Sequence, residues 1–226
     1  MLNLKGPSVA RIAPFALYIL FLMLDQPLSG LFGAMGADVR WLYACRVGMV
    51  AILLAWFWRN YSELAWPPAM PRQTWLASGL VGVIVFFLWI LPYPEWAKLG
   101  AGGAGFNPMQ PDGTTNLLLA AIRLSGAALV VPVMEELFWR SFIMRWLDRS
   151  DFMAADPMRV DRRAFFVTAL LFAVEHHLWL AGLFAGIAFG WLYKQCRNLW
   201  APVLAHGITN AMLGIWVLAR GAWQYW

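Results

Sequence analysis

Apolar stretches alternate with short polar or Gly- and Pro-rich connections along the whole chain. The apolar stretches cover roughly residues 12–33, 41–58, 74–92, 116–147, 163–178, 180–195 and 198–218. A helix needs about 20 mostly apolar residues to cross a bilayer. The first stretch is interrupted by Pro14, Asp25 and Pro27. The pattern predicts an all-α fold, with residues 1–226 forming a single integral membrane domain, a polytopic transmembrane bundle of about seven helices.

The composition supports a membrane protein. Of the 226 residues, 62% are hydrophobic and 13% are charged, whereas soluble domains contain about 25% charged residues. The lipid bilayer is therefore the expected partner of most of the surface. The formal net charge of +5 does not indicate a nucleic-acid partner, because in a membrane protein the placement of Lys and Arg matters more than their total.

The loops predict an orientation, because cytoplasmic loops are enriched in Lys and Arg. With a cytoplasmic N-terminus, that side holds eleven of these residues: Lys5, Arg11, Arg59, Arg72, Arg145, Arg149, Arg159, Arg162, Arg163, Lys194 and Arg197. The opposite side holds Arg40, Lys98 and Arg220, and Arg46, Arg123 and Arg140 lie inside apolar stretches. We expect a multi-pass protein of the cell (cytoplasmic or inner) membrane with its C-terminus outside.

Three charged residues lie together inside one apolar stretch, in "MEELFWRSF" at 134–142. Glu136 and Arg140 are four residues apart, so on a helix they share a face and can form an ion pair. Glu135 points away from that pair into an apolar setting. Ionisable groups at membrane depth are usually functional, although a structural salt bridge with one bystander acid is the simpler alternative.

Two further motifs place histidines at a similar depth. "FAVEHH" has Phe172 four residues before His176, and "HGITN" puts His206 and Asn210 on one face of the last helix. At about 1.5 Å of rise per residue, Glu135, His176 and His206 lie roughly 18, 20 and 12 Å from the cytoplasmic ends of their stretches. Polar residues from three helices therefore converge near the middle of the bilayer.

The connections near these motifs have two expected features. The stretches at 163–195 are too short for two full crossings, which need about 40 residues, so their hairpin is expected to end within the membrane beside a water-filled pocket. The Gly- and Pro-rich loop 93–115 is interpreted as a plain connector rather than a cover over an opening. Arg46 and Arg123 are expected to pair locally or to extend toward the membrane surface rather than to contact substrate.

Together these residues have the groups needed to hydrolyse an amide with activated water. Glu135 can accept a proton from water with His176 beside it, and His206 and Asn210 can donate to a developing oxyanion. The sequence places no Ser or Cys as an obvious nucleophile and contains no H-E-x-x-H motif. A zinc ion bound by Glu135, His176 and His206 remains an alternative.

The three motifs, in this order, resemble the signature of the CPBP family, which comprises type II CAAX prenyl endopeptidases and bacteriocin-processing or immunity proteins. The resemblance covers about 116–226, the expected catalytic core, and is greatest to bacterial CAAX-protease-related proteins associated with exosortase sorting systems. It implies a multi-helix intramembrane endopeptidase in which Glu135 and His176 activate water and His206 and Asn210 form the oxyanion hole. No cofactor is expected, with the zinc ion as the alternative. Glu136, Arg140 and Phe172 support the site, and a membrane-anchored peptide or protein is the substrate.

The same resemblance leaves the helix count at seven or eight, because members of the family usually have an eighth helix. A catalytically silent scaffold or immunity-type protein is an alternative function, although the motifs are intact. A small transporter is a third, less favoured because transporters more often show repeated halves, which this sequence lacks.

Overall fold

The structure is a computed structural model that describes residues 6–100, 102 and 105–226. Within these ranges every regular element is a helix, and the one isolated bridge pairs Met109 with Thr115. The all-α prediction is confirmed. The α-helices are α1 (Pro7–Met23), α2 (Asp25–Ala34), α3 (Trp41–Trp56), α4 (Arg72–Trp89), α5 (Leu117–Ser125), α6 (Val131–Glu136), α7 (Met144–Asp148), α8 (Arg162–Val174), α9 (Trp179–Cys196) and α10 (Trp200–Arg220).

Two π-helical segments, Gly126–Val130 and Leu137–Ile143, join α5, α6 and α7 into one helix of 32 residues over Leu117–Asp148. Short 3₁₀ turns occupy the connections: η1 (Trp58–Asn60), η2 (Ser62–Leu64), η3 (Glu95–Ala97), η6 (Phe152–Ala154), η7 (Pro157–Arg159) and η8 (Trp223–Tyr225). Each predicted apolar stretch corresponds to one of the helices or, for the first stretch, to the pair α1 and α2.

Three of the described helices are long and apolar enough to cross a membrane: α4, the Leu117–Asp148 helix and α10. The α1–α2 pair is a fourth candidate, but it bends by 62° at its break. The break lies at Leu24, next to Asp25, whereas Pro14 lies inside α1 without ending it. The protein is therefore a multi-pass membrane protein. Because α3 has 16 residues and α8 has 13, both are shorter than the roughly 20 residues of a full crossing.

Local sequence signals explain several helix ends. The side chains of Asn116 and Asp161 accept hydrogen bonds from the backbone N–H groups of the first turns of α5 and α8, which otherwise have no partner within the helix. Gly221 follows α10 with a φ of 64°, a conformation in which glycine has no Cβ clash. These caps set where the helices begin and end, and therefore the position of each helical residue along the bundle axis.

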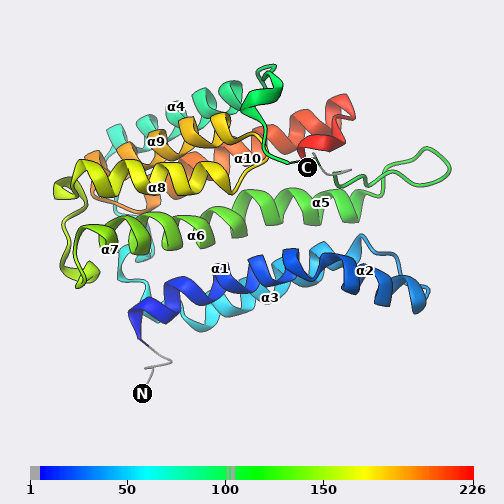
Figure 1. Ribbon diagram of the computed structural model, residues 1–226, viewed down its shortest axis with the longest axis horizontal. Coiled ribbons are helices and arrows are strands. Elements are labelled where there is room, and N and C mark those ends of the chain that lie inside the picture. The colour runs from blue at the N-terminus through cyan, green and yellow to red at the C-terminus, as the bar shows by residue number, and fades with distance from the viewer. Residues whose placement is uncertain (1–5, 101, 103–104) are drawn as a thin grey trace.

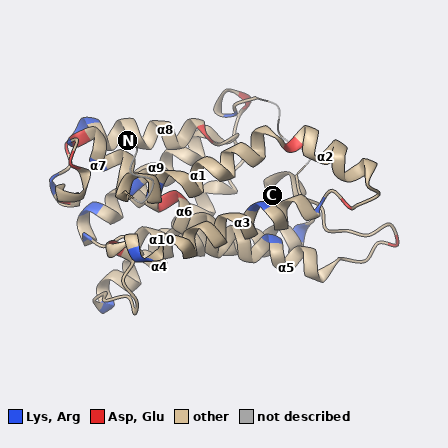
Figure 2. Ribbon diagram, turned by 90° about the horizontal axis from the view of Figure 1, so that it is seen from below, with Lys and Arg blue, Asp and Glu red and all other residues tan. Residues whose placement is uncertain are grey.

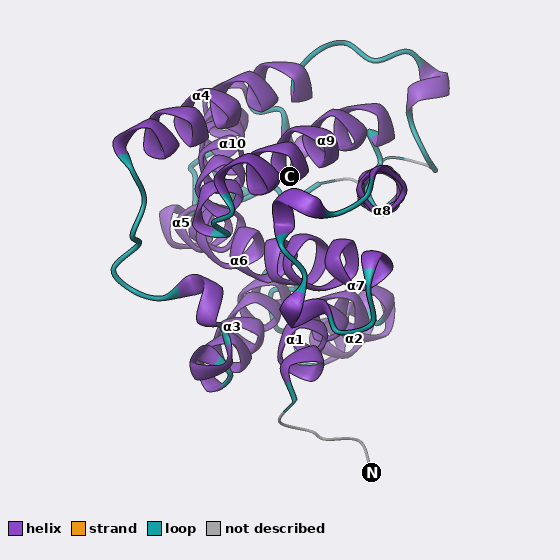
Figure 3. Ribbon diagram, turned by 90° about the vertical axis from the view of Figure 1, so that its left-hand side faces the viewer, coloured by secondary structure: helices purple, strands orange, loops and turns teal. Residues whose placement is uncertain are grey.

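The helices form layers on both sides of the Leu117–Asp148 helix (Figures 1 and 3). α1 and α3 lie on one side of it, and α4, α8, α9 and α10 lie on the other. α10 packs against α4, α9 and α6, and α8 pairs with α9. Two glycines of α9 allow this last pairing, because a Cβ on Gly182 or Gly186 would meet backbone atoms of Ala173 or Ala169 at 3.0–3.2 Å. Small residues at such contacts are typical of membrane helices.

Charged residues gather mostly in the loops and at the ends of the bundle, with a few inside it (Figure 2). One buried group lies where α1, η2 and the Leu117–Asp148 helix meet. Glu63 forms ion pairs with Arg11 and, at 2.6 Å, with Arg145. Ser141 accepts from Arg11 at 2.7 Å and donates to Glu63 at 2.6 Å. We call Arg11, Glu63, Ser141 and Arg145 the Glu63 cluster.

The Glu63 cluster changes the interpretation of the charge count. Arg11 and Arg145, assigned to cytoplasmic loops from the sequence, have 0% and 4% exposed side chains, because each is paired with a carboxylate from another part of the chain. Lys5 lies outside the described residues. Burial of Glu63 alone would raise the pKa of its carboxyl, but Arg11, Ser141 and Arg145 outweigh burial and lower that pKa below the ordinary 4.5. The predicted orientation remains a prediction.

Candidate functional site

The two π-helical segments of the Leu117–Asp148 helix flank its two adjacent glutamates. π-Helical turns widen a helix locally and occur often at functional sites. Glu135, Glu136 and Arg140 have 6%, 0% and 1% of their surfaces exposed. The three charged residues of the motif at 134–142 are therefore buried among helices rather than exposed on the surface of the bundle.

Glu136 and Arg140 form the ion pair that their spacing predicts, with 3.0 Å between Oε1 and Nη1. The guanidinium also lies 4.4 Å from the centre of the Phe172 ring and donates a longer hydrogen bond, 3.4 Å, to the carbonyl of Gly186. Arg140 thus links the long helix to α8 and α9. Phe172 supports this arginine as well as the histidine one turn further on.

Glu136 has a second partner that the sequence did not predict. His206 on α10 contacts the same oxygen, Oε1, through its Nδ1 at 2.9 Å. A carboxylate only accepts hydrogen bonds, so Nδ1 of His206 carries the proton. The imidazole also stacks on Phe189, with 5.0 Å between ring centres and 21° between planes. The ring is held from two directions, and its Nε2 is left to face Glu135.

Glu135 is the carboxylate with no ion-pair partner at normal range. Its Oε2 atom is buried, makes no hydrogen bond to any described residue, and lies 4.0 Å from Nε2 of His206. Buried polar atoms almost always have a partner, so this oxygen is suited to bind a water or a substrate group. The nearby Glu175 differs, because it accepts a hydrogen bond of 3.0 Å from the indole of Trp139.

His176, two residues past the end of α8, is oriented by that helix. Its Nδ1 lies 2.8 Å from the carbonyl oxygen of Phe172, and because a carbonyl only accepts, Nδ1 carries the proton and Nε2 is free to accept. The ring of Phe172 lies 4.7 Å from the imidazole, as the spacing predicted, and Trp89 from α4 meets it edge-on at 5.2 Å.

Asn210 lies one turn after His206 on α10. Its amide donates a hydrogen bond of 2.8 Å to the carbonyl of Ala127, in the first π-helical segment. An amide group has two N–H donors, and this bond uses one of them. The contact fixes the side chain and leaves the second N–H for another acceptor.

A cavity of about 220 Å³ brings these groups together, and we call it the central cavity. Five of the seven residues predicted for the site line it: Glu135, Phe172, His176, His206 and Asn210. Glu136 and Arg140 lie behind this wall and contact it through His206 and Phe172. The volume is enough for several waters, each of which takes about 30 Å³ in the liquid. It combines a carboxylate oxygen, a free imidazole nitrogen and a fixed amide.

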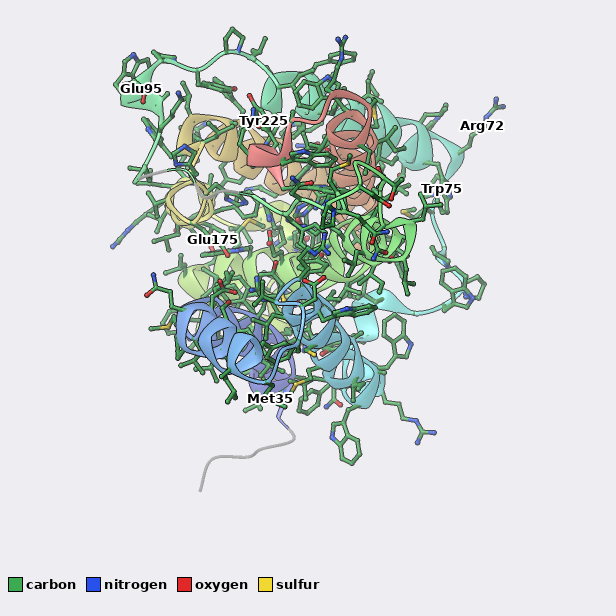
Figure 4. All side chains as sticks on the ribbon, turned by 90° about the vertical axis from the view of Figure 1, so that its right-hand side faces the viewer. Met35, Arg72, Trp75, Glu95, Glu175 and Tyr225 are labelled. Carbon is green, nitrogen blue, oxygen red and sulfur yellow. The ribbon has the colours of Figure 1, made fainter. Side chains whose placement is uncertain are left out.

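Some residues that line the central cavity were not predicted for the site. They include Tyr18, Trp89, Arg123, Tyr225 and Trp226. Their sequence signals are weak, because a single aromatic or arginine in an apolar helix fits packing equally well. In the end-on view of Figure 4, the C-terminal segment with Tyr225 lies across the side of the bundle that faces the reader.

The loop 93–115 is attached to the bundle by several hydrogen bonds. Leu99 and His177 exchange two hydrogen bonds of 2.7 Å, which accounts for His177 as a support of the loop rather than of the cavity. Further along, Phe106 donates its backbone N–H to Trp226 at 3.1 Å. The second attachment places the loop beside a residue of the cavity wall, so it is more than a free connector.

The zinc alternative does not fit this arrangement. Among the described residues, no group of three His, Cys, Asp or Glu side chains is placed to hold a metal ion. Nδ1 of His206 is bonded to Glu136, and its Nε2 lies 4.0 Å from Glu135. Glu135, His176 and His206 line one cavity, but they are not gathered around one point as zinc ligands would be.

Residues 114–212 match the model of a protein family described as type II CAAX prenyl endopeptidase Rce1-like. The matched part begins just before the Leu117–Asp148 helix and ends within α10, so it includes every residue predicted for the site. No curated protein and no solved structure matches the chain. None of the comparisons links the chain to an exosortase system.

Proposed function

We propose that the protein is an intramembrane endopeptidase that hydrolyses a peptide bond of a membrane-anchored peptide with a water activated by Glu135. One observation carries the proposal: three helices place Glu135, His176, His206 and Asn210 around one cavity, and Glu135 has an oxygen there without a partner. The match of residues 114–212 to an endopeptidase family supports the same class of reaction.

In this scheme a water binds between Oε2 of Glu135 and Nε2 of His176. Glu135 accepts a proton from the water as its oxygen attacks the carbonyl carbon of the peptide bond. Nε2 of His176 accepts the second water hydrogen as a hydrogen bond and orients the attacking lone pair. Protonated Glu135 then gives its proton to the leaving nitrogen as the carbon–nitrogen bond breaks, so protons and electrons balance without another reactant.

His206 and the second N–H of Asn210 hold the oxyanion in this scheme. Since Nδ1 of His206 donates to Glu136, Nε2 can donate only when the ring carries both protons. The scheme therefore requires a doubly protonated His206 when the oxyanion forms. Donors fixed before the reaction stabilise an oxyanion more than mobile water does.

The proposal is tested with the purified full-length chain in lipid nanodiscs and a fluorogenic farnesylated peptide ending in a CAAX sequence. Glu135→Gln should abolish cleavage, because the amide keeps the shape of the acid and cannot accept the proton. Glu175→Gln is the comparison variant, because Glu175 is a nearby carboxylate that is exposed and does not line the central cavity. The cleavage rate of Glu175→Gln should be at least 100-fold higher than that of Glu135→Gln.

The outcomes separate the alternatives. Equal activity of wild type and Glu135→Gln would refute the mechanism. Absence of cleavage by the wild type, tested over a set of farnesylated, acylated and unmodified peptides, would favour the silent scaffold or immunity-type protein. Mass spectrometry of the membrane-anchored peptides in cells with and without the gene identifies which peptide is cut.

A further inference from the structure

Arg123 borders two cavities at once. It lines the central cavity, and it also lines a larger pocket of about 540 Å³ between α2, α3 and the loop 93–115. We call this second space the outer pocket. Of the three arginines that line it, Arg40 and Arg46 are absent from the central cavity. Arg123 therefore lies at the boundary between the candidate site and the pocket next to it.

The three arginines differ in their partners. Arg40 pairs with Asp38 at 2.6 Å, and Arg46 pairs with Asp25 at 3.0 Å. Arg123 has no ion pair with any described carboxylate, and its Nε atom, like that of Arg46, is buried without a hydrogen-bond partner. The expectation of local pairing is confirmed for Arg46, whereas Arg123 has no anionic partner.

Aromatic rings surround the Arg123 guanidinium instead. Its central carbon lies 4.3 Å from the ring centre of Tyr43, 5.9 Å from Phe106 and 5.8 Å from Trp226. Cation–π contacts attract a guanidinium but leave its charge uncompensated. The rings also restrict the plane of the guanidinium, which borders both cavities, so its planar donors are placed for an anion that matches them. A carboxylate matches a guanidinium with two parallel hydrogen bonds.

The distance to the candidate base limits which anion fits. Arg123 and Glu135 lie twelve residues apart on one continuous helix, which corresponds to roughly 18 Å along the axis. An extended peptide covers at most about 3.6 Å per residue, so a peptide that spans this full distance needs at least about five residues. A hydrogen bond of about 3 Å at each end, to Arg123 and to the water held by Glu135, shortens the span to roughly 12 Å. A carboxylate bound at Arg123 would therefore belong to a residue at least about three positions from a peptide bond at Glu135.

We propose that Arg123 binds the C-terminal carboxylate of the substrate peptide and thereby sets which peptide bond lies at Glu135. The inference rests on the proposed endopeptidase function. A CAAX sequence ends its chain, so such a substrate brings a free carboxylate close to any bond within it. Arg123 is a positioning residue in this role, since it binds the part of the substrate that leaves and does not touch the reacting atoms.

Binding to the full-length Glu135→Gln protein in phosphatidylcholine nanodiscs tests the proposal without depending on cleavage. The probes are two dansylated, farnesylated CAAX peptides that differ only at the end, one a free acid and the other a carboxamide. The acid should bind about 10- to 100-fold more tightly, the range expected for a hydrogen-bonded charge pair. Adding Arg123→Gln should reduce the affinity for the acid to that for the amide and leave the affinity for the amide unchanged.

Two further variants keep this test specific. Arg123→Lys should retain part of the preference, because it keeps the charge and loses the planar pair of donors. Arg46→Gln is the matched control, an arginine of the outer pocket with its own carboxylate partner, and it should keep the full preference for the acid. Unchanged affinity of Arg123→Gln for the amide shows that the variant is folded.

Several outcomes would overturn the proposal. They are equal binding of acid and amide to the protein with Arg123 intact, no binding of either, and a preference that survives Arg123→Gln. A lipid phosphate as the anion would be recognised by equal binding of acid and amide together with Arg123-dependent retention of phosphatidylglycerol in native mass spectrometry. Failure of the proposed function would give a different result: the wild-type protein would bind the acid peptide and would not cleave it.

Discussion

Glu136 and His206, seventy residues apart in sequence, are joined by a hydrogen bond of 2.9 Å between Oε1 and Nδ1. The same oxygen accepts a bond of 3.0 Å from Arg140. Glu136 therefore orients an imidazole on α10 while its own position is set by an arginine one turn along its helix. Through this relationship the Nε2 atom of His206 lies 4.0 Å from Glu135. Four predictions concern this site and the bundle that supports it.

Loss of Arg140 should reduce stability as well as activity. Arg140→Ala leaves Glu136 buried without its cation, which typically costs about 3–5 kcal/mol of unfolding free energy. Denaturant unfolding in mixed micelles, followed by circular dichroism, measures the change. Adding Glu136→Gln to Arg140→Ala removes the stranded charge and should recover part of the loss. An Arg140→Ala protein as stable as wild type would show that the ion pair has little structural role.

The donors to the oxyanion should affect rate rather than binding. His206→Ala and Asn210→Ala should each slow turnover roughly 100- to 1000-fold with little change in KM, because the oxyanion exists only in the transition state. Steady-state kinetics with the farnesylated peptide measures both constants. An equal rise in KM and no change in kcat would assign the two residues to substrate binding instead. Stoichiometric zinc in the wild type that is lost in His206→Ala would contradict the metal-free scheme.

The Glu63 cluster should make stability depend on acid pH. The pKa of Glu63 is lower in the folded protein than its ordinary value of 4.5, so the ionised form is the one that folding favours. Its contribution to the unfolding free energy is fully present above pH 4.5 and is lost as the pH falls through the lowered pKa. Thermal unfolding between pH 7 and pH 3 should show this loss.

The matched variant for this prediction is Glu63→Gln. It should be less stable at pH 7 by about 3–5 kcal/mol, because Arg11 and Arg145 lose their carboxylate while buried. It should also show a smaller decrease of stability below pH 4.5 than the wild type. A wild type and a Glu63→Gln protein with parallel pH profiles would place the acid sensitivity elsewhere.

The orientation of the bundle is tested by cysteine labelling. Ser150 and Asp112 are suitable labelling positions, because both are exposed and they lie in the two polar loops predicted on opposite sides. Ala155 and Gly105, in the same loops, are unsuitable for a cysteine: Ala155 is buried, and Gly105 has a φ of 72° with no room for a Cβ. In a Cys45→Ala, Cys196→Ala background, an impermeant maleimide should label Asp112→Cys in intact cells. It should label Ser150→Cys only after the membrane is opened. Labelling of both in intact cells would contradict a cytoplasmic N-terminus with seven crossings.

The sequence by itself determined the all-α membrane bundle, because long apolar stretches can satisfy their backbone groups in lipid only as helices. It also determined the contacts within one helix. Glu136 and Arg140 are four residues apart, and helix geometry alone places such a pair on one face. Phe172 and His176 have the same spacing, although His176 lies just past the end of α8. The Asn116 and Asp161 caps are likewise local, so they can be recognised from the residues that surround them.

Only the tertiary structure decided the contacts between helices. The bond from His206 to Glu136, the bond from Asn210 to Ala127 and the Glu63 cluster depend on how each helix is rotated about its axis and where it crosses its neighbours. Spacing along the chain contains neither quantity, because many combinations of rotation and crossing bury the same apolar faces. For the same reason, Arg123 resembled an ordinary locally paired arginine until α3, α5, the loop 93–115 and the C-terminal segment were placed around it.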